Sequence, residues 1–154
     1  MGVLPSSKML RDYKLGVDVG STTVKALLVE DGTVRWQADT LAHDRAYSVT
    51  GAPQIAGKVV VIGNGGAEFD SRGYVSAYDL ETGEMKWRFY TVPGDPSKPQ
   101  ENKALEMAVK TWDPKSRWDQ GLGGNAWDGF AYDPKTNLVY FGTANGAPWN
   151  SAHR

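Results

Sequence analysis

The 154-residue sequence contains no cysteine, and neither basic nor acidic side chains are in excess. Without cysteine, the chain has no disulfide scaffold, thiolate zinc site, iron–sulfur cluster or thiol nucleophile. Its 17 basic and 18 acidic side chains leave a net charge of −1, which favours neither a nucleic acid nor an anionic membrane surface as partner. We therefore expect no nucleic-acid binding.

Long apolar runs are also absent from the sequence. No stretch approaches the roughly 18 apolar residues of a membrane-spanning helix, so no membrane span is predicted. Residues 1–14 contain no apolar run long enough for a signal peptide, so the chain as written is expected to be cytoplasmic. We expect this segment to be a disordered or extended start.

Turn-forming and aromatic residues are plentiful, with 18 Gly, 8 Pro, 6 Trp and 7 Tyr. This composition favours short strands over long helices. Residues 15–31 show two runs of alternating apolar side chains around a Gly-Ser-Thr turn, which predicts a half-buried β-hairpin. One short helix is predicted in the 100–111 region, where apolar residues recur at helical spacing. Further strands are predicted over 33–41, 58–63, 73–80, 85–92, 127–133 and 138–149.

Two short patterns recur along the chain. Residues 32–36 (GTVRW) resemble residues 83–87 (GEMKW), and residues 78–83 (YDLETG) resemble residues 132–137 (YDPKTN). A period of about 50 residues built of four short strands is typical of a β-propeller blade. Blades stack because one four-stranded sheet cannot cover both of its own faces. The predicted fold is therefore all-β and mainly antiparallel, a partial β-propeller of about two blades.

An incomplete propeller would leave two strand edges and one blade face uncovered. Uncovered edges readily pair with strands of another chain. We therefore expect self-association through these edges.

Residues 32–150 resemble the quinoprotein alcohol dehydrogenases, which use pyrroloquinoline quinone (PQQ) together with calcium, and residues 32–154 are assigned to a quinoprotein propeller fragment. The matching runs lie at residues 47–53 (YSVTGAP), 63–99 and 123–150. The resemblance implies a β-propeller with PQQ in a central chamber and hydride transfer from a small primary alcohol to the quinone. It also implies a periplasmic location for the parent enzyme.

The resemblance assigns two metal ligands and a stacking platform. Glu68, in the GGAE run, and Asn145, in the GTANGAPWN run, correspond to calcium ligands of the family. Carboxylate and amide oxygens are ligands that calcium prefers. Trp127 corresponds to the floor on which the flat quinone stacks, a contact that suits its large π surface.

Five further residues are assigned to the cofactor by the same resemblance. The backbone of Gly65, Gly66 and Ala67 lines the quinone, because small residues permit close approach. Thr50 corresponds to a hydroxyl that hydrogen-bonds a PQQ carboxylate. Asn125 stands where the family often has threonine.

Two features of the family have no counterpart in this sequence. The aspartate proposed as general base belongs to a later segment of the family, and a vicinal disulfide usually lies upstream of the YSVTGAP run. No catalytic residue is therefore assigned. The expectation is a fragment of a PQQ- and calcium-dependent alcohol dehydrogenase that is inactive alone.

Residues 15–31 resemble a different family: they are similar to the first phosphate loop of actin-like ATPases such as acyl-CoA dehydratase activators and sugar kinases. That resemblance places Asp18 near a metal and the attacking water, and Lys25 near phosphate. Gly20, Ser21 and Thr22 would offer donors to phosphate. In a plain β-hairpin the same residues would have no such role.

The two resemblances meet at residues 29–32, and this seam predicts a chimera, with a recombined design and a misassembled reading frame as alternatives. Two alternative functions follow from the seam. One is a nucleotide-binding ATPase fragment, and the other is a structural or designed β-protein that self-assembles without chemistry.

Overall fold

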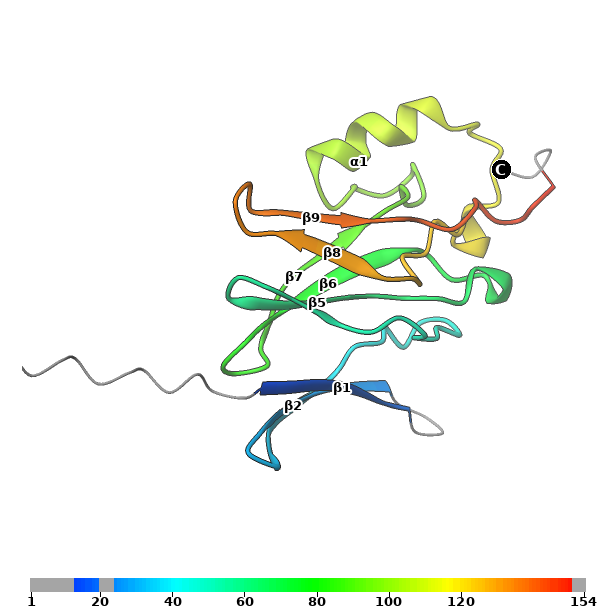
Figure 1. Cartoon of the computed structure of the whole chain (residues 1–154). Helices are drawn as coiled ribbons and strands as arrows, with labels where there is room; N and C mark the ends of the chain where they lie inside the picture. Colours follow the sequence, from blue (N-terminus) through cyan, green and yellow to red (C-terminus); the bar gives the residue numbers. More distant parts are fainter. Residues whose placement is uncertain (1–12, 20–23, 151–154) are drawn as a thin grey trace, which may run out of the picture.

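A computed structural model describes residues 13–19 and 24–150, which form three stacked antiparallel sheets (Figure 1). The first sheet has the order β1 (Tyr13–Val19), β2 (Val24–Glu30), β3 (Thr33–Asp39). The second has the order β4 (Gln54–Ala56), β5 (Val59–Gly63), β6 (Tyr74–Asp79), β7 (Met85–Tyr90). The third is a hairpin of β8 (Phe130–Asp133) and β9 (Leu138–Phe141).

Four short helical segments complete the described fold: η1 (Ala67–Phe69), α1 (Lys103–Ala108), η2 (Val109–Thr111) and η3 (Trp118–Gln120). The expected short helix is confirmed. It begins after Asn102, whose Oδ1 accepts a hydrogen bond from the Leu105 backbone N–H at 3.0 Å, and it buries Leu105. Among the described residues, no helix is long and apolar enough to span a membrane.

The predicted all-β partial propeller is confirmed, with some differences in the strands. One complete four-stranded sheet lies between a three-stranded sheet and a two-stranded hairpin. The strand β4 was not predicted, because three residues between two turns are too few to show an alternation. The last strand ends at Phe141, and residues 142–150 form loops instead of continuing the strand predicted to residue 149.

The N-terminal hairpin is continuous with the first sheet. β2 pairs with β3 directly across the boundary expected at residues 31 and 32, through a tight turn in which Asp31 and Gly32 have positive φ. Asp18 and Lys25 lie opposite each other in the β1–β2 pair. The other residues of the expected phosphate loop, Gly20, Ser21 and Thr22, lie outside the described residues.

The inner strands of the central sheet, β5 and β6, are buried on both faces. Val60 and Ile62 of β5 pack in a core with the first sheet, and Val61 packs in a second core with the β8–β9 hairpin. Successive side chains of a strand point to opposite faces, so a strand buried on both sides reads as an uninterrupted apolar run. This explains the sequence VVVIG over residues 59–63.

Trp36 joins the first sheet to the second. Its indole Nε1 donates a hydrogen bond to the Leu80 carbonyl at 2.9 Å, and only 8% of the residue is exposed. The ring covers Gly83, where an added Cβ would lie 2.6 Å from the indole. Gly83 also has a φ of +74°, so glycine is required there for two reasons.

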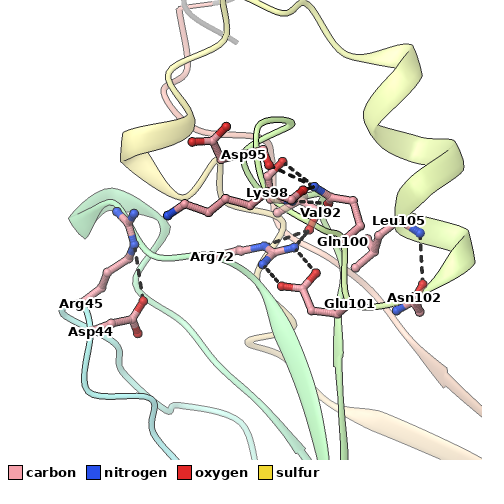
Figure 2. A network of polar contacts seen from close by, with 11 residues as sticks. Asp44, Arg45, Arg72, Val92, Asp95, Lys98, Gln100, Glu101, Asn102 and Leu105 are labelled. Atoms are coloured by element: carbon pink, nitrogen blue, oxygen red, sulfur yellow. Dashed lines mark hydrogen bonds and ion pairs between the residues drawn. The ribbon is translucent and has the colours of Figure 1, made fainter.

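An arginine ties the long loop between β7 and β8 to the central sheet (Figure 2). The Arg72 guanidinium pairs with both carboxylate oxygens of Glu101, at 2.5 and 3.0 Å. It also donates to the Val92 carbonyl at 2.9 and 3.1 Å, and it lies 4.0 Å above the centre of the Tyr90 ring. The pairing anchors the first part of this loop, at Val92 and Glu101, to the residue two positions before β6.

Replacing Trp36 should destabilise the protein more than replacing an exposed apolar residue of the same strand. We expect Trp36→Ala to lower the free energy of unfolding by about 3–5 kcal/mol, because it leaves a cavity between two sheets. Trp36→Phe should retain most of the packing and lose about 1 kcal/mol with the hydrogen bond. Urea unfolding followed by circular dichroism measures both, with Val34→Ala (54% exposed) as control. Equal midpoints for Trp36→Ala and Val34→Ala would contradict the role of Trp36.

The Arg72–Glu101 pair predicts a pH dependence of stability. The hydrogen bonds from Arg72 hold the pKa of the Glu101 carboxyl below its usual value. The pair therefore stabilises the fold above the unfolded pKa of about 4.3, and this contribution is lost as pH falls through the lower folded pKa.

The Glu101→Gln variant should accordingly have a lower urea midpoint than the wild type at pH 7. The two midpoints should converge well below pH 4. The difference should be under about 1 kcal/mol, because Glu101 is largely exposed. In an Arg72→Gln background, Glu101→Gln should leave the pH profile of the midpoint unchanged. A full pH-dependent difference in that background would show that another group pairs with Glu101.

Candidate functional site

All eight residues selected from the sequence line one cavity of about 360 Å³. They come from four segments that are far apart in the chain and meet at the ends of the strands: Thr50; Gly65, Gly66, Ala67 and Glu68; Asn125 and Trp127; and Asn145. The structure therefore brings the whole predicted set together. Three further residues, Ser48, Ala144 and Trp149, complete the lining.

The glycine pair at the end of β5 forms the first wall. The Gly65 N–H donates to the Ser48 carbonyl at 2.8 Å, and an added Cβ at Gly65 would lie 2.7 Å from the Ser48 hydroxyl oxygen. At Gly66, φ is +99° and an added Cβ would lie 2.7 Å from the Ala46 carbonyl. Only glycine allows this close crossing, after which η1 begins at once and brings Glu68 to the cavity.

Asn125 stabilises this wall by buried hydrogen bonds. The residue is fully buried, and its Nδ2 donates to the Gly65 carbonyl at 3.2 Å and to the Ser71 hydroxyl oxygen at 2.8 Å. The Ser71 hydroxyl in turn donates to the same Gly65 carbonyl at 3.2 Å. The Oδ1 atom of Asn125 has no hydrogen-bond partner among the described residues, so a buried acceptor stays available at the site.

The fourth segment is fixed by backbone hydrogen bonds to the third. The Gly124 N–H donates to the Asn145 carbonyl at 3.2 Å, and the Ala144 N–H donates to the Asn125 carbonyl at 2.8 Å. Gly123 and Gly146 form an isolated antiparallel bridge beside them. This pairing places Asn145 in the same cavity as Glu68.

Glu68 and Asn145 are both exposed, and they supply a carboxylate and a carboxamide oxygen. In residues 13–19 and 24–150, no group of three or more His, Asp or Glu side chains is close enough to hold a metal ion. A calcium ion takes six to eight oxygen ligands. The donor set therefore has the chemistry that calcium prefers, and most coordination positions would have to be filled by a bound ligand, backbone oxygens or water.

Two tryptophans give the cavity its aromatic surface. Trp127 is 50% exposed and Trp149 is 81% exposed, and both line it. Trp149 also lines a neighbouring cavity of about 710 Å³ with Trp112. Trp149 was not predicted from the sequence to belong to the site. Its position in the GTANGAPWN run, four residues after Asn145, could have indicated it.

Thr50 is at the cavity, and its hydroxyl donates to the Trp127 carbonyl at 3.1 Å. The hydroxyl proton is thus engaged within the protein. Its expected hydrogen bond to a ligand carboxylate stays a prediction, and it requires the bond to Trp127 to be given up, because a carboxylate can only accept.

The geometry is matched by relatives of known class. A sequence profile described as "PQQ: Glucose/ethanol/alcohol dehydrogenase, beta-propeller domain" matches residues 28–152. The chain is 52% identical over 142 residues to the quinohemoprotein alcohol dehydrogenase ADH-IIG of Pseudomonas putida. It is 45% identical over 142 residues to the quinohemoprotein alcohol dehydrogenase of Comamonas testosteroni. The matches cover 92% and 90% of this chain but only 20% of each relative's length.

Solved structures agree with the sequence matches. The structure of the P. putida HK5 enzyme ADHIIG superposes with a TM-score of 0.76 at 52% identity, over 89% of this chain and 20% of that one. The structure of the C. testosteroni enzyme superposes with a TM-score of 0.75 at 41% identity, over 87% of this chain and 22% of that one. The propeller architecture is therefore shared.

The comparisons do not support the second resemblance. The match to the P. putida dehydrogenase covers 92% of the chain and therefore includes residues 15–31. Nothing in the comparisons supports an actin-like ATPase segment or a chimera. The motif covers only about 18 residues, and apolar alternation around a Gly-Ser-Thr turn is what any short hairpin requires. Because the profile spans most of its length, the chain belongs to the β-propeller family of PQQ-dependent glucose, ethanol and alcohol dehydrogenases.

Proposed function

We propose that the cavity is part of a PQQ and calcium site, and that the chain is part of an enzyme that oxidises small primary alcohols. One observation carries this proposal: eight residues from four separate segments, chosen by family motif, line the same cavity. The relatives named above are quinohemoprotein alcohol dehydrogenases, and the chain spans 20% of their length. When bound, PQQ accepts a hydride from the alcohol carbon.

Glu68 and Asn145 are the proposed calcium ligands. Both line the cavity, Glu68 from η1 and Asn145 from the loop after β9. Backbone hydrogen bonds to neighbouring segments hold both in place. The Glu68 carboxylate would also supply the negative charge that attracts a divalent cation. Because two side-chain ligands leave most positions of a calcium ion unfilled, the metal and the quinone should bind together, each completing the site of the other.

Trp127 is the proposed platform for the quinone. Its exposed indole offers a flat apolar surface, and aromatic rings favour offset stacking. The backbone of Gly65 and Gly66 and the small side chain of Ala67 would let the ring system approach the opposite wall. Asn125 would contribute its unpaired Oδ1 as an acceptor, and Thr50 its hydroxyl.

No residue of the cavity is proposed as general base, since the one carboxylate there is assigned to the metal. Removal of the alcohol proton would need a group from elsewhere in the propeller. The chain alone should therefore bind cofactor without turning over alcohol. The periplasm is the proposed site of action of the complete enzyme.

Titration of the folded chain with PQQ, with and without calcium, tests the proposal by calorimetry. We expect calcium-dependent binding. Glu68→Gln should remove the calcium dependence, because an amide is neutral, and Trp127→Ala should weaken binding by about tenfold or more. Glu106→Gln, an exposed substitution on α1, is the matched control and should bind like the wild type.

Two results would contradict the proposal. One is the absence of binding at ~100 μM PQQ with calcium, when circular dichroism shows the native sheet content. The other is binding that Glu68→Gln and Trp127→Ala leave unchanged.

A further inference from the structure

The sequence contains the dipeptide Asn-Gly twice, at Asn64-Gly65 and at Asn145-Gly146. In this dipeptide the asparagine can lose its side-chain amide without an enzyme. The backbone nitrogen of the next residue attacks the side-chain carbonyl carbon, and glycine has no side chain that would hinder the attack. The two asparagines have opposite surroundings in the structure.

Asn64 has hydrogen bonds at both polar atoms of its side chain. The residue is fully buried, its Nδ2 donates to the Gly65 and Arg72 carbonyls at 3.3 and 3.1 Å, and its Oδ1 accepts from the Tyr74 N–H at 2.7 Å. The attacking nitrogen is engaged as well, because the Gly65 N–H donates to the Ser48 carbonyl at 2.8 Å. Attack on Asn64 therefore requires this part of the fold to open first.

Asn145 is exposed and lines the cavity of the candidate site. Its backbone carbonyl accepts a hydrogen bond from the Gly124 N–H, but within residues 13–19 and 24–150 its side-chain amide has no hydrogen-bond partner. The side chain is therefore accessible to water and to the neighbouring backbone, in contrast to that of Asn64.

The backbone bridge at Gly146 leaves the attacking nitrogen out of the pairing. The two hydrogen bonds of this bridge run from the Gly124 N–H to the Asn145 carbonyl, at 3.2 Å, and from the Ala147 N–H to the Leu122 carbonyl, at 2.9 Å. In an antiparallel bridge of this kind the flanking residues make the hydrogen bonds and the bridged pair does not. The pairing thus fixes the segment without using the Gly146 N–H.

We propose that Asn145 is a site of spontaneous deamidation in this chain and that the fold protects Asn64 from the same reaction. The Gly146 nitrogen bonds to Cγ of Asn145 and loses its proton, while the Cγ–Nδ2 bond breaks and ammonia leaves. Water then opens the cyclic imide at either of its two carbonyl carbons. Opening at the side-chain carbonyl gives aspartate. Opening at the main-chain carbonyl gives isoaspartate, in which the chain runs through the former side chain.

Either product changes the candidate site. Of the described residues, Glu68 is the one carboxylate that lines the cavity, so deamidation adds a second negative charge there. Isoaspartate also lengthens the main chain and converts the carbonyl that accepts from the Gly124 N–H into part of a free carboxylate. Aspartate would give the proposed calcium site a second charged ligand. This last consequence rests on the proposed function, whereas the reaction itself does not.

Mass spectrometry of the full chain tests the proposal without PQQ or calcium. The chain is incubated at mildly alkaline pH, either native or unfolded in urea, and is then digested with trypsin; a sample taken at the start corrects for deamidation during digestion. Asn64 and Asn145 fall in different peptides, residues 59–72 and 136–154. Fragmentation distinguishes Asn145 from the other two asparagines of its peptide.

In urea we expect the two asparagines to deamidate at similar rates, since glycine follows both. In the native chain Asn145 should react at least about tenfold faster than Asn64, because attack on Asn64 requires local unfolding. Gly146→Ala should slow the reaction at Asn145 several-fold, in the native chain and in urea alike, because a Cβ hinders the attacking nitrogen. Gly129→Ala, where an added Cβ meets no atom within 4 Å, is the matched control and should leave the rate unchanged.

Three results would overturn the proposal. Modification of Asn145 in urea but not in the native chain would show that the fold protects it. Equal rates at Asn64 and Asn145 in a chain with native circular dichroism would show that the contacts of Asn64 give no protection. An unchanged rate in Gly146→Ala would assign the loss of the amide to direct hydrolysis by water. None of these outcomes depends on cofactor binding, so failure here is distinguishable from failure of the proposed function.

Discussion

The candidate site depends on one backbone carbonyl, that of Gly65, on which donors from four places in the chain converge. The Ser48 N–H, the Asn64 and Asn125 side-chain amides and the Ser71 hydroxyl all lie within 3.2–3.4 Å of its oxygen. A buried carbonyl must be satisfied, and several charge-free donors share this task here. Three of the four segments that line the cavity are therefore held to one another at a single point, and the fourth is bonded to the third.

This convergence is possible because side chains are missing where backbones cross. An added Cβ would lie 2.0 Å from the Ala126 carbonyl at Gly63, and 2.2 Å from the Gly124 carbonyl at Gly73. The loop that carries Asn125 and Trp127 thus rests directly on the ends of β5 and β6. Arg72, one residue before Gly73, pairs with Glu101 in the long loop between β7 and β8. Fold and site are held by the same short segment.

Much of the fold could be predicted from the sequence, because strand alternation and turn residues are local signals. The hairpin at 15–31, the strands around Val60 and Val75 and the short helix near Leu105 were expected and are present. The three-residue β4 and the early end of β9 were not, since pairing with neighbouring strands sets them. The actin-like interpretation of Asp18 and Lys25 arose from a motif too short to separate a phosphate loop from an ordinary hairpin.

The candidate site, like the fold, could be predicted from the sequence only in part. The sequence by itself determined the donor types, Glu68 and Asn145, the aromatic Trp127 and the glycines between them, because residue identity and motif spacing are properties of the chain. Only the tertiary structure decided that they share one cavity, that Trp149 joins them and that the Thr50 proton is already engaged. Trp36 and Trp87 likewise hold equivalent positions in the repeated sequence pattern, yet Trp36 is buried and Trp87 is about half exposed. The reason is physical: burial and hydrogen bonding depend on which segments pack together, and segments far apart in the chain carry no local record of that contact.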